Sequence, residues 1–207
     1  LAASIVLATE WAKDPAEAFI GPMCGSGTLA IEAAWIAQNR APGLAREDYA
    51  FLHLAGADVG AWRELQAEAR AKFVSAPRTW IAASDVEPQA IACARENAGR
   101  AGVENLIRFH TCDFRDTPLP KPPALIVMNP EYGERMGLEE RLVPLYEAIG
   151  TYFKTKCQGM RAAVFTGNLA LGRKIGLHPT RRTALWNGDI ECRLLEFDVY
   201  AGTRDAR

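Results

Sequence analysis

The residues whose types suggest chemistry begin at Asn129, directly after the apolar run 124–128. An exocyclic amine on a nucleobase is a poor nucleophile because its lone pair is delocalised into the ring. The Asn129 side-chain oxygen and the Pro130 carbonyl can accept the two amine hydrogens and so direct the lone pair at a sulfonium methyl. Tyr132 can stack on the base. The pattern predicts methylation of an amino nitrogen, with Asn129, Pro130 and Tyr132 as the catalytic residues.

Glu131 is the unusual residue of this motif, because a tetrad of this kind normally reads Asn-Pro-Pro-Tyr. A glutamate loosens the backbone and places a charge beside the amine site. The remaining three residues are intact, so we interpret the motif as altered but functional. The alternative is an Asn-Pro turn after a strand, with Tyr132 as a core residue.

A glycine-rich stretch, residues 21–28, offers a second possible site. Gly25 to Ala30 matches the G-x-G-x-x-A pattern, in which glycines allow close backbone approach to a ligand. A nicotinamide site needs an acidic residue about 20 positions further on, whereas Asp85 is 60 positions beyond Gly25. A P-loop is excluded because no Lys-Ser or Lys-Thr pair follows the glycines. The stretch also suits a turn that needs glycine only for packing.

Two aspartates follow the next two apolar runs and complete the pattern. Asp85 can accept hydrogen bonds from both hydroxyls of a ribose, and Asp113 can accept one from an adenine amino group. Either carboxylate alone is also typical of a helix cap or a solvated loop. Together, at the ends of successive strands, they predict a pocket for an adenosine.

The elements that must position these residues alternate between strand and helix, which predicts a largely parallel sheet with helices on both faces. We expect helices over 2–11, 28–38, 88–101 and 139–156, and an inserted segment over about 41–76 with an amphipathic helix at 61–73. We expect seven strands, over residues 16–20, 79–84, 106–111, 124–128, 162–166, 181–186 and 190–200. The last two flank Asn187-Gly188-Asp189, and Asn-Gly predicts an antiparallel hairpin.

Composition indicates a soluble globular protein, with 49% hydrophobic and 24% charged residues. No two of the five cysteines form a C-x-x-C pair, so we expect reduced thiols and no metal site. Cys24 has no basic neighbour in sequence and is expected to be a packing residue. The first residues resemble neither a signal peptide nor a membrane span, and the absence of an initial methionine suggests that the chain begins inside a longer protein.

Basic residues are concentrated late in the chain: residues 151–207 contain 10 basic and 5 acidic residues, against 14 and 20 in residues 1–150. Such residues can form a patch that faces phosphates, although solvated surface charge is the simpler interpretation. The residues concerned are Lys154, Lys156, Arg161, Arg173, Lys174, Arg181 and Arg182.

The chain resembles a known family over nearly its whole length, the bacterial large-subunit ribosomal RNA guanine-N2 methyltransferases of the RlmL type. The resemblance rests on residues 22–34, Ala41-Pro42, 84–88, 94–98, Asn129-Pro130 with Tyr132-Gly-Glu-Arg135, and 185–194. It implies one class I, Rossmann-like domain over 1–207 that binds S-adenosylmethionine. The implied cofactor-binding residues are Pro22, Cys24, Gly25, Ser26, Gly27, Thr28, Asp85, Val86, Asp113, Phe114 and Asn129.

By the same resemblance, the substrate is a guanine N2 amine in 23S rRNA or its precursor particle. The family implies a THUMP RNA-binding domain upstream and a cytoplasmic location, and the sequence leaves the oligomeric state open. One departure besides Glu131 is Gly21, where the family usually has an aspartate. Two alternatives stay open: an adenine-N6 DNA methyltransferase with the same Asn-Pro-x-Tyr logic, and a degenerate domain that binds RNA without a cofactor. A dehydrogenase is disfavoured, because it would leave residues 129–132 unexplained.

Overall fold

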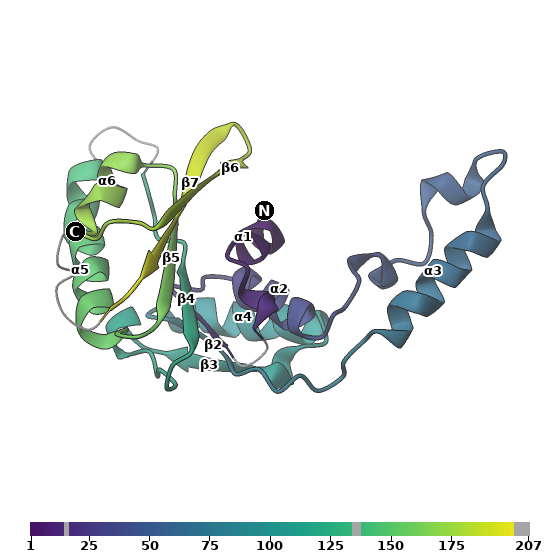
Figure 1. The fold of residues 1–207 in the computed structure, drawn as a ribbon, viewed down its shortest axis with the longest axis horizontal. Helices are drawn as coiled ribbons and strands as arrows, with labels where there is room; N and C mark the ends of the chain where they lie inside the picture. Colours follow the sequence, from purple (N-terminus) through teal and green to yellow (C-terminus); the bar gives the residue numbers. More distant parts are fainter. Residues whose placement is uncertain (15–16, 134–137, 201–207) are drawn as a thin grey trace.

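A computed structural model describes residues 1–14, 17–133 and 138–200 (Figure 1). Seven strands form one sheet in the order β3-β2-β1-β4-β5-β7-β6, in which only β7 pairs antiparallel to its neighbours. This confirms the predicted mostly parallel sheet that ends in an antiparallel hairpin. The strands are β1 (Ala18–Pro22), β2 (Ile81–Asp85), β3 (Ile107–Thr111), β4 (Ala124–Met128), β5 (Arg161–Thr166), β6 (Arg181–Asn187) and β7 (Ile190–Asp198).

Helices cover both faces of the sheet, as predicted (Figure 1). One core cluster joins the sheet to α1, α2 and α4, and a second joins its other face to α5 and α6. The short α6 was not predicted; its N-cap Asn168 accepts hydrogen bonds from Ala170 and Leu171. The helices are α1 (Ala2–Ala8), α2 (Thr28–Ala37), α3 (Val59–Ala71), α4 (Pro88–Arg100), α5 (Leu138–Lys156) and α6 (Leu169–Lys174).

Several predicted boundaries were wrong, and three of them have a clear local cause. The first strand, expected at 16–20, is β1 (Ala18–Pro22), because Gly21 and Pro22 stay in register with β2 instead of opening the turn; residue 16 lies outside the described residues. The first helix ends at Ala8 because Glu10 has a left-handed φ of 57°. The hairpin loop is Gly188-Asp189, one residue later than expected, with Gly188 supplying the positive φ of 60°.

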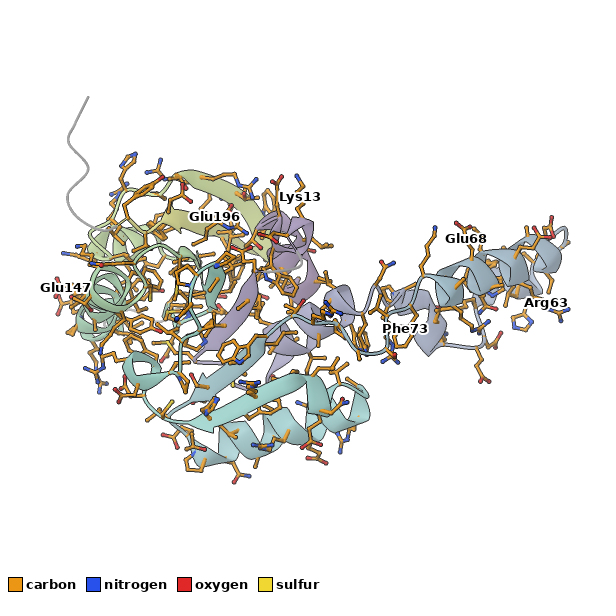
Figure 2. The ribbon with its side chains drawn as sticks, turned by 60° about the horizontal axis from the view of Figure 1, so that its bottom comes forward. Lys13, Arg63, Glu68, Phe73, Glu147 and Glu196 are labelled. Atoms are coloured by element: carbon orange, nitrogen blue, oxygen red, sulfur yellow. The ribbon has the colours of Figure 1, made fainter. Side chains whose placement is uncertain are left out.

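The segment between α2 and β2 projects from the body as an arm (Figures 1 and 2). Figure 2 shows Arg63, Glu68 and Phe73 spread along it, away from the sheet. Its helix α3 confirms the amphipathic helix predicted at 61–73, yet none of the residues of α3 is buried. Trp62 instead packs on two rings of the same arm, with centroids 5.2 Å from each, those of Tyr49 and Phe51. The arm therefore has its own aromatic cluster.

No helix within the described ranges is long and apolar enough to cross a membrane.

The packing of α6 on α5 generates a test of stability. A Cβ atom at Gly150 of α5 would overlap the backbone carbonyl oxygen of Ile175, which directly follows α6. Alanine is a better helix former than glycine by about 1 kcal/mol, but overpacking against backbone typically costs about 1–3 kcal/mol. We therefore expect Gly150→Ala to lower the free energy of unfolding, measured by urea denaturation.

Gly99→Ala is the matched control, because Gly99 is also helical and its added Cβ would meet only the flexible carboxylate of Glu104, at 3.5 Å. We expect this variant to be neutral or more stable by up to about 1 kcal/mol. Equal effects of the two alanines would contradict the close-packing interpretation.

Candidate functional site

The candidate site lies at the carboxyl edge of the sheet, where β1, β2 and β4 end side by side. Pro22 of β1 pairs with Ser84 of β2, and β4 runs parallel to β1 on its other side. The loops that follow parallel strands leave the sheet at the same edge. The glycine-rich loop, Asp85 and the Asn129 motif are therefore neighbours, as the sequence predicted.

The glycine-rich loop is tied to β2 and α4. Gly25 N donates to the Asp85 carboxylate at 2.9 Å, and Cys24 N donates to the Ser84 carbonyl at 2.9 Å. Gly27 has a φ of 81°, and a Cβ there would lie 2.8 Å from the Ala94 Cβ. Only glycine suits this position, because both the backbone angle and the contact with α4 exclude a side chain.

Other predicted loop residues surround this framework. Pro22 is buried at the end of β1, and the side-chain oxygens of Ser26 and Thr28 lie 3.1 Å apart. Asn97 of α4 donates to the Ser26 carbonyl at 3.1 Å. Burial, reinforced by the negative charge of Asp85, raises the pKa of the Cys24 thiol to about 12. Cys24 is therefore a neutral thiol at physiological pH, which supports the interpretation as a packing residue.

Asp85 holds the loop and keeps capacity for a ligand. One carboxylate oxygen accepts from Gly25 N and the other from Glu87 N, at 3.1 Å. A carboxylate has about four lone-pair sites, so the remaining two can accept ribose hydroxyls. Next to it, the Val86 side chain is 61% exposed, and a Cβ added at Gly25 would meet no atom within 4 Å. The open loop beside a carboxylate and an exposed apolar side chain fits an adenosine-containing cofactor.

Asp113 is held more tightly than the sequence suggested. It caps the short turn Phe114–Asp116, and its two oxygens pair with the Arg115 guanidinium at 2.7 and 2.8 Å. The hydrogen bonds from Arg115 lower the pKa of the Asp113 carboxyl. The Phe114 side chain is buried against Tyr152, so residue 114 can present only its backbone to an adenine.

The Asn129 motif directly follows β4. Asn129 is exposed, Pro130 is buried and the Glu131 side chain is exposed. The Glu131 carbonyl accepts a hydrogen bond from the Tyr146 hydroxyl of α5 at 3.3 Å, and that hydroxyl lies 2.9 Å from the Thr166 hydroxyl. The Tyr146 hydroxyl thus supports the backbone carbonyl of residue 131. Because every residue type has this carbonyl, the support does not depend on the Glu131 side chain.

Tyr132 lies between the loop after β5 and the tip of the hairpin. The Asn187 side chain donates to its hydroxyl at 2.8 Å. A Cβ added at Gly167 would lie 2.9 Å from the Tyr132 ring, so the ring rests directly on backbone. Sequence reasoning missed Tyr146, Gly167 and Asn187 as site residues. Asn187 belongs to residues 185–194, which carry the family resemblance, but its Asn-Gly pair predicts only a turn. Residues 134 and 135, which follow Tyr132 in the motif stretch, lie outside the described residues.

Comparison with known proteins identifies the family. Residues 1–196 match the model of UPF0020, the RMKL-like methyltransferase domain. A relative from Allochromatium vinosum, named ribosomal RNA large subunit methyltransferase K/L, is 41% identical over 205 residues, which are 96% of this chain and 28% of the relative. The chain thus spans less than a third of that relative's length.

Solved structures share the fold. The crystal structure of SMU.472 in complex with SAH is 28% identical with a TM-score of 0.83, and the match covers 99% of this chain and 52% of that one. The structure of a predicted N6-adenine-specific DNA methylase from Listeria monocytogenes is 30% identical with a TM-score of 0.81, over 97% of this chain and 50% of that one.

Family, sheet order and site agree with one another. The cofactor of this fold class is S-adenosylmethionine, and the candidate adenosine pocket lies at the carboxyl edge of the sheet, where ligands of open parallel sheets bind. The chain belongs to the UPF0020 family of RMKL-like methyltransferase domains and has the class I fold of S-adenosylmethionine-dependent methyltransferases.

Proposed function

We propose that this chain transfers a methyl group from S-adenosylmethionine to the exocyclic N2 amine of a guanine in 23S rRNA. The observation that carries the proposal is the arrangement of residues 129–132: Asn129 is exposed after β4, and Tyr132 is fixed beside it by Asn187. Only β1 separates β4 from β2, which carries Asp85. An amine and a methyl donor bound at these loops would meet at one edge.

Different residues of the chain would bind the cofactor and orient the target amine. The open loop at Gly25, the Asp85 carboxylate and the backbone after Asp113 would hold the cofactor, which supplies an electrophilic sulfonium methyl. The Asn129 oxygen and the Pro130 carbonyl accept the amine hydrogens, and the Tyr132 ring stacks on the base. No strong general base is needed, because orientation and a good leaving group lower most of the barrier.

The relatives support the proposed substrate and partners. The relative from Allochromatium vinosum is named for large-subunit ribosomal RNA methylation, so we infer 23S rRNA or its precursor particle as partner. The chain spans only 28% of that relative, which leaves room for further domains in the relative. We also propose that all of 1–207 acts as one methyltransferase domain beside an upstream THUMP domain. The target guanine would have to leave its helix to reach the motif.

The Listeria structure supports one alternative, adenine-N6 methylation of DNA, because an adenine amine can use the same two acceptors. The degenerate domain without a cofactor is the other alternative, and it rests on Gly21 and Glu131. Cofactor titration and product analysis separate these three functions.

The first prediction concerns the cofactor, measured by calorimetric titration of S-adenosylmethionine. We expect one-to-one binding that Asp85→Asn weakens roughly tenfold, because hydrogen bonds to a charged acceptor contribute about 1.5–3 kcal/mol. Asp58→Asn is the control, since Asp58 also accepts a backbone N–H, from Ala61 at 2.8 Å, but lies on the arm. We expect that change to leave the affinity unaltered.

Gly21→Asp extends this test. A Cβ at residue 21 makes only ordinary contacts, 3.6 Å from the Phe19 ring and 3.9 Å from the Ala82 carbonyl, so a side chain can begin there without a clash. We expect tighter binding by about tenfold, from a carboxylate that accepts hydrogen bonds from the methionine ammonium. Binding by Gly21→Asp combined with none by the unaltered chain would identify a lapsed cofactor site.

The second prediction concerns the product. With labelled S-adenosylmethionine and 23S rRNA, we expect N2-methylguanosine in nuclease digests analysed by mass spectrometry. Asn129→Ala should reduce the turnover number by about a hundredfold or more, because the amine loses its orienting acceptor. Methyladenine in DNA with none in RNA would favour the alternative enzyme.

The third prediction concerns the hydrogen bond between Asn187 and Tyr132. Asn187→Ala and Tyr132→Phe both remove it, so we expect each to raise the KM for RNA by a similar factor, about threefold to tenfold. The double variant should be no worse than either single variant, because the same interaction is lost. Additive losses in steady-state kinetics would show that Asn187 acts independently of Tyr132.

A further inference from the structure

A cavity of about 420 Å³ lies between α6 and the closing hairpin, outside the cofactor loops. Its buried lining includes Gly172 and Leu195, whereas Arg173, His178 and Arg182 are exposed. Arg193 of β7 is partly exposed and pairs in register with Thr166, the last residue of β5. The next residue, Gly167, supports the Tyr132 ring. Only the loop after β5 therefore separates the Arg193 end of the cavity from Tyr132 of the methylation motif.

The pleat of β6 separates two consecutive arginines. Arg181 points to the α1 face, where it pairs with Glu196 at 2.6 Å and donates to the Ala8 carbonyl. Arg182 pairs in register with Leu195, which belongs to the core cluster on the α5 and α6 face. Successive side chains of a strand point to opposite faces, so Arg182 faces the cavity.

The cavity is electropositive. None of its described lining residues is acidic. Arg173 and Arg182 form no ion pair with the described residues, and Arg193 has one acidic partner, Glu191, at 2.9 Å. Two arginines that form no ion pair with the described residues, Arg173 and Arg182, lie beside apolar side chains, which suits a ligand that carries both phosphates and rings.

An exposed aromatic side chain extends the same surface towards the motif. Trp186 lies four residues after Arg182 on β6, so it shares the cavity face, about 13 Å further along the strand. Its side chain is 58% exposed. The next residue, Asn187, holds Tyr132 from the opposite face. The stripe Arg182–Trp186 thus runs from the cavity to the edge where the target base would bind.

We propose that this hairpin face, formed by Trp186, Arg182, Arg193 and Arg173, binds the single-stranded RNA that flanks the target nucleotide. Trp186 stacks on a base, and the arginines bind the phosphates that follow. The assignment to RNA rests on the proposed function. A spacing of about 13 Å between the aromatic ring and the cavity spans about two nucleotides of an extended strand, and aromatic platforms beside basic grooves are the general means of binding single strands.

The experiment measures binding separately from catalysis. A fluorescein-labelled, unstructured RNA oligonucleotide is titrated with the unaltered chain, Arg173→Ala/Arg182→Ala, Trp186→Ala and Trp186→Phe, at several salt concentrations, with anisotropy as readout. Arg100→Ala is the matched control, because Arg100 is 72% exposed but ends α4 at the opposite edge of the sheet. Thermal melting and cofactor calorimetry verify that each variant is folded.

We expect the double arginine variant to weaken binding roughly tenfold and to reduce the slope of log affinity against log salt by about 1.4, about 0.7 for each lost phosphate contact. Trp186→Ala should weaken binding roughly fivefold to a hundredfold without changing that slope, and Trp186→Phe should restore most of the loss. Arg100→Ala should match the unaltered chain.

The proposal would be overturned if the double arginine variant and Trp186→Ala both bound the RNA with the affinity and salt slope of the Arg100→Ala control. It would also be overturned if the unaltered chain did not bind the RNA. Failure of the proposed function has a different signature, in which the unaltered chain binds the oligonucleotide through this face yet transfers no methyl group to 23S rRNA.

Discussion

The close approach of the glycine-rich loop to α4 is the constraint on which the site depends. At Gly27 a methyl group would lie 2.8 Å from Ala94, so the loop can enter α2 only if both residues stay small. That approach brings Gly25 within reach of Asp85, whose carboxylate holds the loop at 2.9 Å. One packing contact thus sets both the backbone of the candidate cofactor loop and its hydrogen bond to the Asp85 carboxylate.

A similar constraint operates on the substrate side. Tyr132 rests on Gly167, where a Cβ would lie 2.9 Å from the ring, and Asn187 fixes its hydroxyl. Gly167 follows β5, which pairs directly with β4, and Asn187 ends β6, which reaches this part of the sheet because β7 pairs antiparallel with β5. The antiparallel end of the sheet is therefore part of the site, since it carries Asn187 to the end of β4.

The sequence predicted what local rules determine. Alternating strands and helices predicted the sheet, and the residues after β1, β2 and β4 were expected together at one edge, because parallel strands bring their carboxyl ends together. It did not predict α6, which is a six-residue helix capped by Asn168, nor the supporting roles of Tyr146 and Gly167. The roles of Tyr146 and Gly167 depend on contacts between separate elements, which periodicity does not record, and α6 is too short to show a periodic pattern. Asp113 pairs with a residue only two positions away, but that pairing depends on side-chain conformation.

The late basic residues show most clearly what the sequence alone does not determine. The late excess of basic residues suggested a phosphate-facing patch, but Arg161 is paired with Glu17 at 2.6 Å and Arg181 with Glu196. The first ion pair links residues 144 positions apart and the second joins the two strands of the hairpin, so both belong to the fold. Arg182 differs from Arg181 by one position, and the strand's period of two places it on the other face, beside Arg193 and Trp186. The face to which each arginine points, more than the number of arginines, therefore decides which of them can meet a phosphate.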